Sequence, residues 1–124
     1  RAEITRENGV EVTTHMRARF PSFSFTGTTS MRMHPRQEVV FHGSDGVMRL
    51  TAPFNAGVFG QAEVELHRGM SVTVERFPAA NQYVLQVEAF GRSVREGSPY
   101  PWTLEDARGT QAMLDMAWAG ETAA

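Results

Sequence analysis

The period of the hydrophobic pattern changes once along this chain of 124 residues, and that change constrains the fold most strongly. In the first part, apolar residues alternate with polar ones, as they do from Val10 to Phe20. Alternation places successive side chains on opposite faces and predicts half-buried β-strands. From Asn81 onward, apolar residues recur at helical spacing instead. Strands first and helices last favour the α+β class, with helices gathered on one face of an antiparallel sheet.

Turn residues divide the first part into six or seven strands. Asn8-Gly9 and Asp45-Gly46 are pairs that supply the positive φ of tight hairpins, so the strands around them should pair antiparallel. The sequence thus predicts one open, mainly antiparallel sheet of six or seven strands. We expect these strands, in chain order, at residues 2–6, 10–20, 23–34, 37–43, 47–51, 62–67 and 70–75.

Two helices are expected after the strands, both packed on one face of the sheet. The first covers Asn81–Glu96 and ends at Gly97, which can adopt the left-handed cap conformation. Prolines in the linker 98–102 exclude a helix there. The second begins at Thr103, whose hydroxyl can cap the amide of Asp106. Residues 1–124 are accordingly expected to form a single domain. The expected buried stripe of the second helix is Leu104, Ala107, Met113, Leu114, Ala117 and Trp118.

Composition excludes several classes of function. Twelve basic and fourteen acidic residues leave a formal charge of -2, unlike the concentrated positive charge of general nucleic-acid binders. All the basic residues are Arg, so the chain supplies neither a Schiff-base lysine nor a Walker-type phosphate lysine. The chain has no Cys, which excludes disulfides and fits a reducing cytoplasm. No apolar stretch could span a membrane. Because the chain begins at Arg1, we expect it to be a fragment of a longer protein.

No cluster of residues has the spacing of a known catalytic or metal site. The four histidines lack the HExxH spacing, and we expect no metal. Glu63 and Glu65 share a strand face, but no apolar pocket separates their pKa values, so a solvated face is favoured over a catalytic pair. No glycine motif leads into a helix that could hold a dinucleotide. The residues alone therefore assign no catalytic, cofactor-binding or metal-binding role.

Three features in chain order resemble the C-terminal part of one protein family. Residues 8–10 match a turn, and Phe41–Leu50 matches a hairpin of pattern hGt.G.l.l, with Ser44 in place of the usual Thr. Asn81–Arg95 and then Pro101–Ala107 match the final helices. Together these segments resemble the glucose–fructose oxidoreductase, inositol dehydrogenase and rhizopine-catabolism (Gfo/Idh/MocA) family.

The resemblance implies that the chain is most of the second domain of such an oxidoreductase. Members typically oxidise or reduce a sugar or cyclitol hydroxyl with NAD or NADP, which an N-terminal dinucleotide-binding domain holds. The family's GxGxxG loop and EKP lysine belong to that first domain, and its D-x-x-x-H helix has no match in this sequence. The resemblance therefore carries over no catalytic or cofactor residue, and we expect this chain alone to be inactive.

The function of the chain is expected to lie in its polar sheet face. In the family, the open sheet covers one side of the substrate site and often packs against a second subunit. Small hydroxyl side chains allow close sheet-on-sheet approach, and Arg can pair with the glutamates of a partner. We expect a homodimer that buries on the order of 1,500 Å² or more, with a solvated face or a sheet-edge interface as alternatives. The expected interface residues are Arg17, Arg19, Ser24, Thr26, Thr28, Ser30 and Arg32.

A free-standing α+β module that binds a small molecule such as a carbohydrate, or acts as a scaffold, is the alternative function. In that case Phe54 and Phe59 of one loop and Tyr100 and Trp102 of the proline-rich linker would form an aromatic pocket. Inward packing of the linker aromatics between helix and sheet is the favoured interpretation of the same residues.

Overall fold

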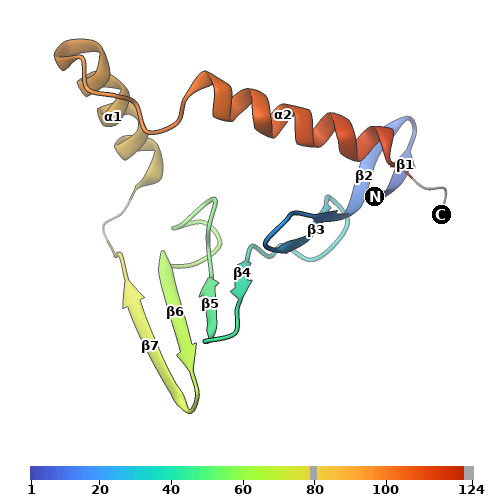
Figure 1. Cartoon of the computed structure of the whole chain (residues 1–124), viewed down its shortest axis with the longest axis horizontal. Coiled ribbons are helices and arrows are strands. Elements are labelled where there is room, and N and C mark those ends of the chain that lie inside the picture. The colour runs from blue at the N-terminus through green and yellow to red at the C-terminus, as the bar shows by residue number, and fades with distance from the viewer. Residues whose placement is uncertain (79–80, 122–124) are drawn as a thin grey trace. The chain divides into compact units, whose positions relative to one another are not determined.

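The structure is a computed structural model that describes residues 1–78 and 81–121. Its described part contains seven strands followed by two helices, which confirms the α+β class (Figure 1). The chain divides into two compact units. One comprises Arg1–His34 and Pro101–Ala124, and the other comprises Pro35–Tyr100. That all 124 residues form one domain remains a prediction.

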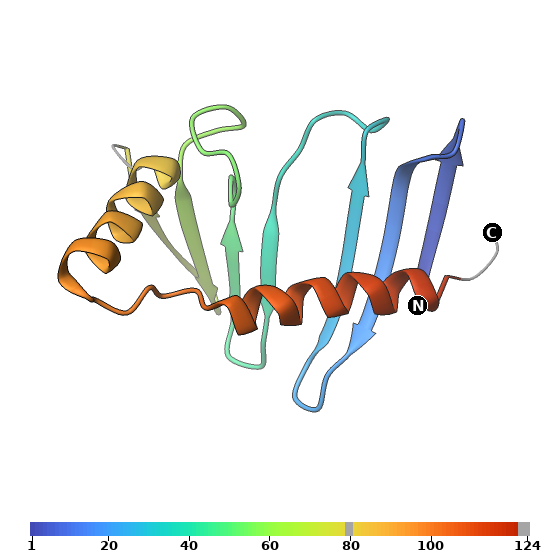
Figure 2. The same cartoon turned by 90° about the horizontal axis from the view of Figure 1, so that it is seen from above.

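The first unit contains a three-stranded antiparallel sheet. Its strands are β1 (Ala2–Glu7), β2 (Val10–Arg19) and β3 (Ser24–Ser30), paired in that order. Asn8 and Gly9 have φ values of 52° and 79°, so the expected hairpin turn is present. Figure 2 shows the three strands side by side.

The third strand ends four residues earlier than the alternation predicts, and the reason is local. The hydroxyl of Ser30 accepts hydrogen bonds from the amides of Arg32 at 3.0 Å and Met33 at 3.2 Å. A serine that captures the amides after it offers the backbone an alternative to a strand ladder. The amides that would have extended the strand are therefore already bonded, and Pro35 lacks an amide hydrogen altogether.

The second unit contains a separate four-stranded antiparallel sheet, so the expectation of one sheet of six or seven strands is wrong. Its strands are β4 (Val39–His42), β5 (Val47–Leu50), β6 (Glu63–Arg68) and β7 (Ser71–Arg76), paired in chain order. Each of the seven strands overlaps its expected segment, although β3 and β4 are shorter than predicted. What differs is the ladder, because the structure records no pairing between β3 and β4.

The end of the first helix at Gly97 and the start of the second at Thr103 are as predicted. Helix α1 (Gln82–Glu96) begins after Asn81, whose side chain accepts the amides of Tyr83 and Val84, and ends at Gly97 with φ 67°. Helix α2 (Leu104–Ala119) begins after Thr103. In the described part of the chain, neither helix is long and apolar enough to cross a membrane.

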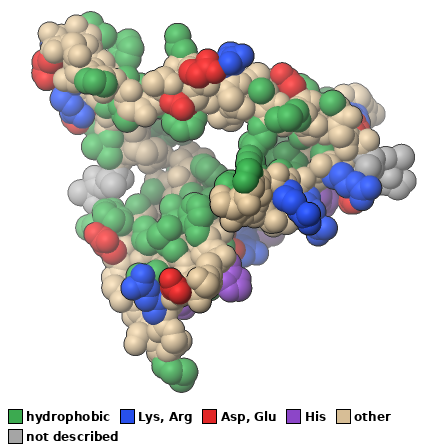
Figure 3. Space-filling view, in the orientation of Figure 1, with side chains coloured by type: hydrophobic (Ala, Val, Ile, Leu, Met, Phe, Trp, Pro, Cys, Tyr) green, Lys and Arg blue, Asp and Glu red, His purple; other side chains and the backbone are tan. Residues whose placement is uncertain are grey.

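Neither helix packs as expected, because none of their residues is buried. In α1, Val87 is 71% exposed and Phe90 is 62% exposed. Polar contacts hold this helix to its unit instead. The Gln82 side chain donates to the carbonyl of Phe54 at 3.1 Å, and the Tyr83 hydroxyl contacts Asn55 at 2.9 Å. Figure 3 shows apolar side chains on the surface in the region of α1.

Helix α2 is held to the first unit at its C-terminal end. The amide of Ala2 in β1 donates to the carbonyl of Gly120 at 3.3 Å, and Arg6 forms an ion pair with Glu121. The predicted buried stripe is wrong, because Leu104 is 91% exposed and Trp118 is 52% exposed. Because these contacts hold α2 only near its C-terminal end, its apolar side chains stay exposed within the first unit.

Candidate functional site

Six of the seven predicted interface residues lie on one face of the first sheet. Arg17 is paired with Thr26 across β2 and β3, and Arg19 with Ser24. Cross-strand partners point to the same side of an antiparallel sheet. This surface, called the polar face from here on, also includes Thr5 of β1, opposite Thr13. Its residues are Arg17, Arg19, Ser24, Thr26, Thr28 and Ser30, with Glu3, Thr5, Thr13 and His15.

Two side-chain hydrogen bonds join β2 to β3 on the polar face. The Thr13 and Ser30 hydroxyls lie 2.8 Å apart, and His15 Nδ1 lies 2.9 Å from Thr28 Oγ1. Along β3, Ser24, Thr26 and Thr28 are exposed, whereas their neighbours Phe25 and Gly27 are half-buried. The predicted alternation of a hydroxyl face and an apolar face is thus confirmed from Ser24 to Thr28, whereas Thr29 is exposed and Ser30 is half-buried.

Arg32 stands apart from the other six. It follows the turn at Ser30, and its Nε lies 3.2 and 3.1 Å from the two carboxylate oxygens of Glu7. The hydrogen bond from Arg32 lowers the pKa of Glu7, while partial desolvation opposes that shift. Arg32 is therefore already paired within its own unit, and its guanidinium is not among the open charges of the polar face.

A hollow of about 440 Å³ opens between β1, β2 and β3. Glu3, His15 and Arg17 line it from β1 and β2, and Thr26 and Thr28 line it from β3. Arg1, whose amino group donates to the carbonyl of Arg17 at 3.0 Å, lines it as well. Sequence reasoning missed Glu3 and His15 as members of this surface. The Asn8-Gly9 hairpin carried the signal, because its strand pairing sets Glu3 directly opposite His15.

The polar face carries open charges of both signs. No ion pair joins Glu3, Arg17 or Arg19 to any residue that the structure describes. By contrast, Arg6 at the far end of β1 pairs with both Glu11 and Glu121. Unpaired charges on a flat sheet surface are free to meet a ligand or a partner of complementary charge.

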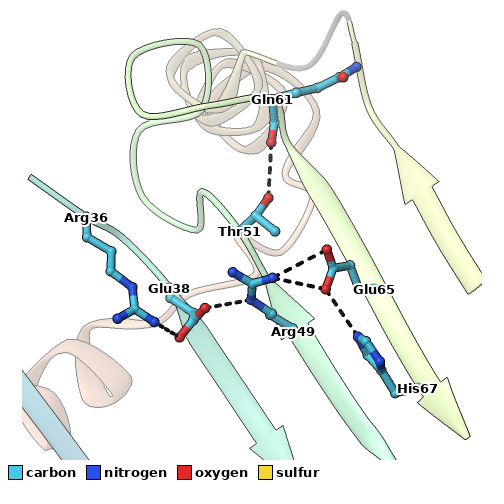
Figure 4. A network of polar contacts seen from close by, with 7 residues as sticks. All are labelled: Arg36, Glu38, Arg49, Thr51, Gln61, Glu65 and His67. Carbon is cyan, nitrogen blue, oxygen red and sulfur yellow. Dashed lines mark hydrogen bonds and ion pairs between the residues drawn. The ribbon is translucent and has the colours of Figure 1, made fainter. Parts of the chain in front are cut away.

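The second sheet carries a different polar feature, a linear series of ion pairs that runs from Arg36 to His67 (Figure 4). Arg49 of β5 lies between two carboxylates, with its Nε 2.6 Å from Glu38 and its Nη1 3.2 Å from Glu65. Arg36 pairs with Glu38 at 2.5 Å, and His67 Nε2 lies 3.2 Å from Glu65. Each carboxylate is therefore shared between two basic side chains.

The ion pairs lower the pKa values of both carboxyl groups. For Glu38, the hydrogen bond from Arg49 is the largest cause, and partial burial opposes it. For Glu65, the hydrogen bond from His67 is the largest cause of the lowered pKa. Burial opposes it, and the hydrogen bond from Arg49 is a smaller cause that also lowers the pKa. Because each carboxylate in the cluster is already paired, this cluster serves to join the segment before β4 to β5 and β6 rather than to activate a proton donor.

Glu63 and Glu65 are less solvated than the sequence predicted. Their side chains are only 17% and 18% exposed, and Glu63 is paired with Arg76 at 2.7 Å. Register explains this arrangement, because β6 sets Glu63 opposite Arg76 of β7 and Glu65 opposite Arg49 of β5. The two carboxylates are thus structural ion-pair partners and not a solvated pair.

Neither helix start fits the pyrophosphate of a dinucleotide. Phosphates bind helix N-termini through open backbone amides. At α1 the Asn81 side chain already accepts from the first amides, and at α2 Thr103 accepts from Asp106. The first turn of α2 also carries the carboxylates of Glu105 and Asp106, which would repel a phosphate.

The alternative function needs an aromatic pocket formed by the loop phenylalanines and the linker aromatics, and the structure supports it only in part. Tyr100 packs its ring edge-on against Phe90 with centroids 6.3 Å apart, in line with inward packing of that linker residue. Trp102 is 58% exposed, so the inward packing predicted for it is wrong. Phe54 and Phe59 are 62% and 42% exposed in the loop before β6. The described residues show no ring contact between these two phenylalanines.

Comparison with known proteins relates the chain to an oxidoreductase. No protein-family model matches the sequence. Over 95 residues, the chain is 30% identical to an uncharacterized oxidoreductase, ORF334, from Rhizobium meliloti. That match covers 73% of this chain and 28% of the Rhizobium protein, so the chain corresponds to about a quarter of that relative. The similarity is distant, and it supports a relationship to oxidoreductases without assigning a family.

Proposed function

We propose that this chain is the C-terminal, substrate-side and oligomerisation domain of an NAD(P)-dependent oxidoreductase. Its parent would act on a sugar or cyclitol hydroxyl, as the resemblance to the Gfo/Idh/MocA family suggests. Similarity to an oxidoreductase of which the match covers only 28% supports a role as one part of a larger enzyme. NAD or NADP would be bound by a dinucleotide-binding domain outside these residues.

The polar face is the observation that carries the proposal. It is an exposed sheet surface of short hydroxyl side chains, and its Arg17, Arg19 and Glu3 have no ion-pair partner among the described residues. A sheet face of this kind is either open to water or packed against a partner. In the proposed role it receives a second copy of the chain, which makes the protein a homodimer.

Two measurements test the proposed function. Light scattering at high micromolar concentration is expected to give twice the chain mass of 13.8 kDa, and a monodisperse monomer would contradict the oligomerisation role. Calorimetric titration with NADH is expected to show no binding in the micromolar range. Micromolar affinity would contradict the assignment of the cofactor to a separate domain.

A titration with simple sugars separates the alternative function from the proposed one. A carbohydrate-binding module with Trp102 in its pocket should change its tryptophan fluorescence when sugar binds. We expect no change, because the chain supplies only part of a substrate site in the proposed role. A saturable change at millimolar sugar would favour the free-standing module.

A further inference from the structure

We infer that the hollow in the polar face binds a small molecule that carries both an acidic group and hydroxyl groups, as a sugar acid or a sugar phosphate does. The inference rests on the proposed function and deepens it by naming the substrate class of the parent enzyme. Two arginines of the hollow hold the acidic group, and the other polar side chains of the hollow hold the hydroxyl groups.

Two arginines lie directly opposite each other at the hollow. The amide of Arg17 donates to the carbonyl of Arg1 at 2.9 Å, and the amino group of Arg1 donates back to the carbonyl of Arg17 at 3.0 Å. Residues so paired have Cβ atoms about 4.5–5.5 Å apart, and like charges at such positions destabilise a sheet. Both side chains are exposed and line the hollow. An anion held between the two guanidinium groups would remove the repulsion between them.

The arginines on this side of the sheet have no carboxylate partner. No ion pair joins Arg1, Arg17 or Arg19 to a residue that the structure describes. The other arginines of the first unit are all paired, namely Arg6, Arg32 and Arg108. Glu3 is the one carboxylate of the polar face, so three guanidinium groups leave a net positive charge there. Guanidinium groups bind carboxylates and phosphates through two parallel hydrogen bonds.

The neighbouring row of the sheet offers partners for hydroxyl groups. Glu3 lies opposite His15, and Thr28 follows on β3. A carboxylate can accept hydrogen bonds from the hydroxyl groups of a ligand, and threonine hydroxyls both donate and accept. His15 Nδ1 lies 2.9 Å from Thr28 Oγ1, and no hydrogen bond joins Nε2 to a described residue. The hollow thus has cations in one row and hydroxyl partners in the next.

Glu3 selects between an anion that carries hydroxyl groups and one that does not. Its carboxylate lines the same opening as Arg1 and Arg17, so it repels a bare anion. A ligand whose hydroxyl groups reach Glu3 donates to the carboxylate, and this hydrogen bond offsets the repulsion. The volume of about 440 Å³ lies within the range of about 300–1,000 Å³ that is typical of small-molecule sites. The chemistry therefore favours a hydroxylated anion over both a bare anion and a neutral sugar.

This site is compatible with the proposed dimer and does not depend on it. A face with a net positive charge repels its own copy, and an anion bound in the hollow lowers that repulsion. Every residue that lines the hollow belongs to one chain, so a monomer can bind the ligand as well.

Calorimetric titrations of the 124-residue chain at constant ionic strength test the site. Glucose 6-phosphate and glucuronate supply the two acidic groups, and inorganic phosphate and glucose are the bare anion and the neutral sugar. At least one hydroxylated anion is expected to bind at least about fivefold more tightly than inorganic phosphate, and glucose should show no binding at the same concentrations. The hydroxylated anion that binds more tightly identifies the acidic group. Binding of neither one, or no preference over inorganic phosphate, would overturn the inference.

Arginine variants show whether the binding occurs at the hollow. Arg17→Gln should weaken binding of the preferred anion at least about tenfold, because its charge-assisted hydrogen bonds are lost. The matched control is Arg92→Gln, which removes an exposed arginine of α1 that forms no ion pair with a described residue, and it should stay within about twofold of wild type. Circular dichroism checks folding, and Arg1→Gln replaces Arg17→Gln if the latter unfolds. Equal affinities of the hollow variant and the control would overturn the site.

Glu3→Gln tests the hydroxyl partners separately. The variant removes the repulsion, so inorganic phosphate should bind more tightly than it does to wild type. The preference for the hydroxylated anion over inorganic phosphate should fall several-fold, because hydrogen bonds to a neutral amide are weaker than those to a carboxylate. An unchanged preference would overturn the assignment of a hydroxylated ligand.

NMR of the histidine rings locates the ligand independently of any variant. The ring resonances of His15 should shift as the preferred anion saturates the chain, because His15 lines the hollow. Those of His42 in β4 of the other sheet should not shift. Shifts of His42 without shifts of His15 would overturn the site.

The outcomes distinguish this inference from the proposed function. If the chain dimerises but no hydroxylated anion binds, the site is overturned and the oligomerisation role stands. If the chain stays monomeric and the hydroxylated anion binds at the hollow, the oligomerisation role is overturned and the site stands.

Discussion

Thr103 and Asp106 cap each other at the start of α2. The amide and hydroxyl of Thr103 both donate to Oδ2 of Asp106, at 2.9 and 2.6 Å, and the Asp106 amide donates back to the Thr103 hydroxyl at 3.1 Å. The arrangement fixes where the helix begins and lowers the pKa of Asp106, chiefly through the side-chain hydrogen bond from Thr103.

Replacing the cap should therefore shorten or destabilise α2. Thr103→Ala is expected to cost about 1 kcal/mol, because it removes the hydroxyl that accepts from one helix amide and donates to Asp106. Chemical denaturation followed by circular dichroism measures the change. Thr110→Ala, which removes a hydroxyl from the middle of the same helix, is the control and should cost nothing. Equal losses in both variants would contradict the capping role.

The same contact predicts a direction for the pH dependence. Because folding lowers the pKa of Asp106, its stabilisation is fully present above the pKa of the unfolded chain and is lost as the pH falls through the folded value. Wild type should thus lose α2 helicity on acidification more steeply than Thr103→Ala. Parallel acid titrations of the two proteins would contradict this prediction.

Arg49 should control the acidity of Glu38 more than that of Glu65. In Arg49→Met we expect the pKa of Glu38 to rise, because its largest stabilising hydrogen bond is lost. The pKa of Glu65 should rise less, since His67 remains beside it. Carboxyl titrations by NMR measure both values. Arg68→Met, at an exposed position with no ion pair to a described residue, should leave the two unchanged.

Gly46 and Gly43 differ sharply in the space around them, although both belong to the β4–β5 turn. A Cβ on Gly46 would collide with the carbonyl oxygen of His67, while one on Gly43 would find its nearest neighbour 3.9 Å away. Gly46→Ala is expected to cost about 1–3 kcal/mol through overpacking, and Gly43→Ala less than about 0.5 kcal/mol. Thermal unfolding compares them, and equal costs would show that the turn tolerates either residue.

Local chemistry made the elements predictable. Alternation and the Asn8-Gly9 turn located β1 and β2, and the Thr103–Asp106 spacing located the start of α2. The end of β3 was not predictable from alternation, because it depends on the hydroxyl of Ser30 capturing the amides that follow. The hydrogen bonds accepted by the Ser30 hydroxyl thus determine where the pairing of β3 with β2 ends.

The candidate site was predictable only as a face. Its residues on β2 and β3, His15 among them, follow from the alternation along those strands, but Glu3 of β1 enters through cross-strand register. The ion pairs around Arg49 depend likewise on the pairing of β5 with β6, whose sequences are separated by the long loop between Leu50 and Glu63. Exposure of the helices, such as Phe90 of α1, depends on tertiary packing that periodicity does not encode.

The central claim is that the polar face meets a second copy, and cross-linking through an introduced cysteine tests it most directly. The chain has no Cys, so Thr26→Cys places a single thiol on the polar face and Thr73→Cys places one on exposed β7 of the other sheet. With a short bis-maleimide at micromolar protein, we expect Thr26→Cys to form covalent dimers at least about tenfold faster than Thr73→Cys. Equal rates for the two variants would contradict the claim.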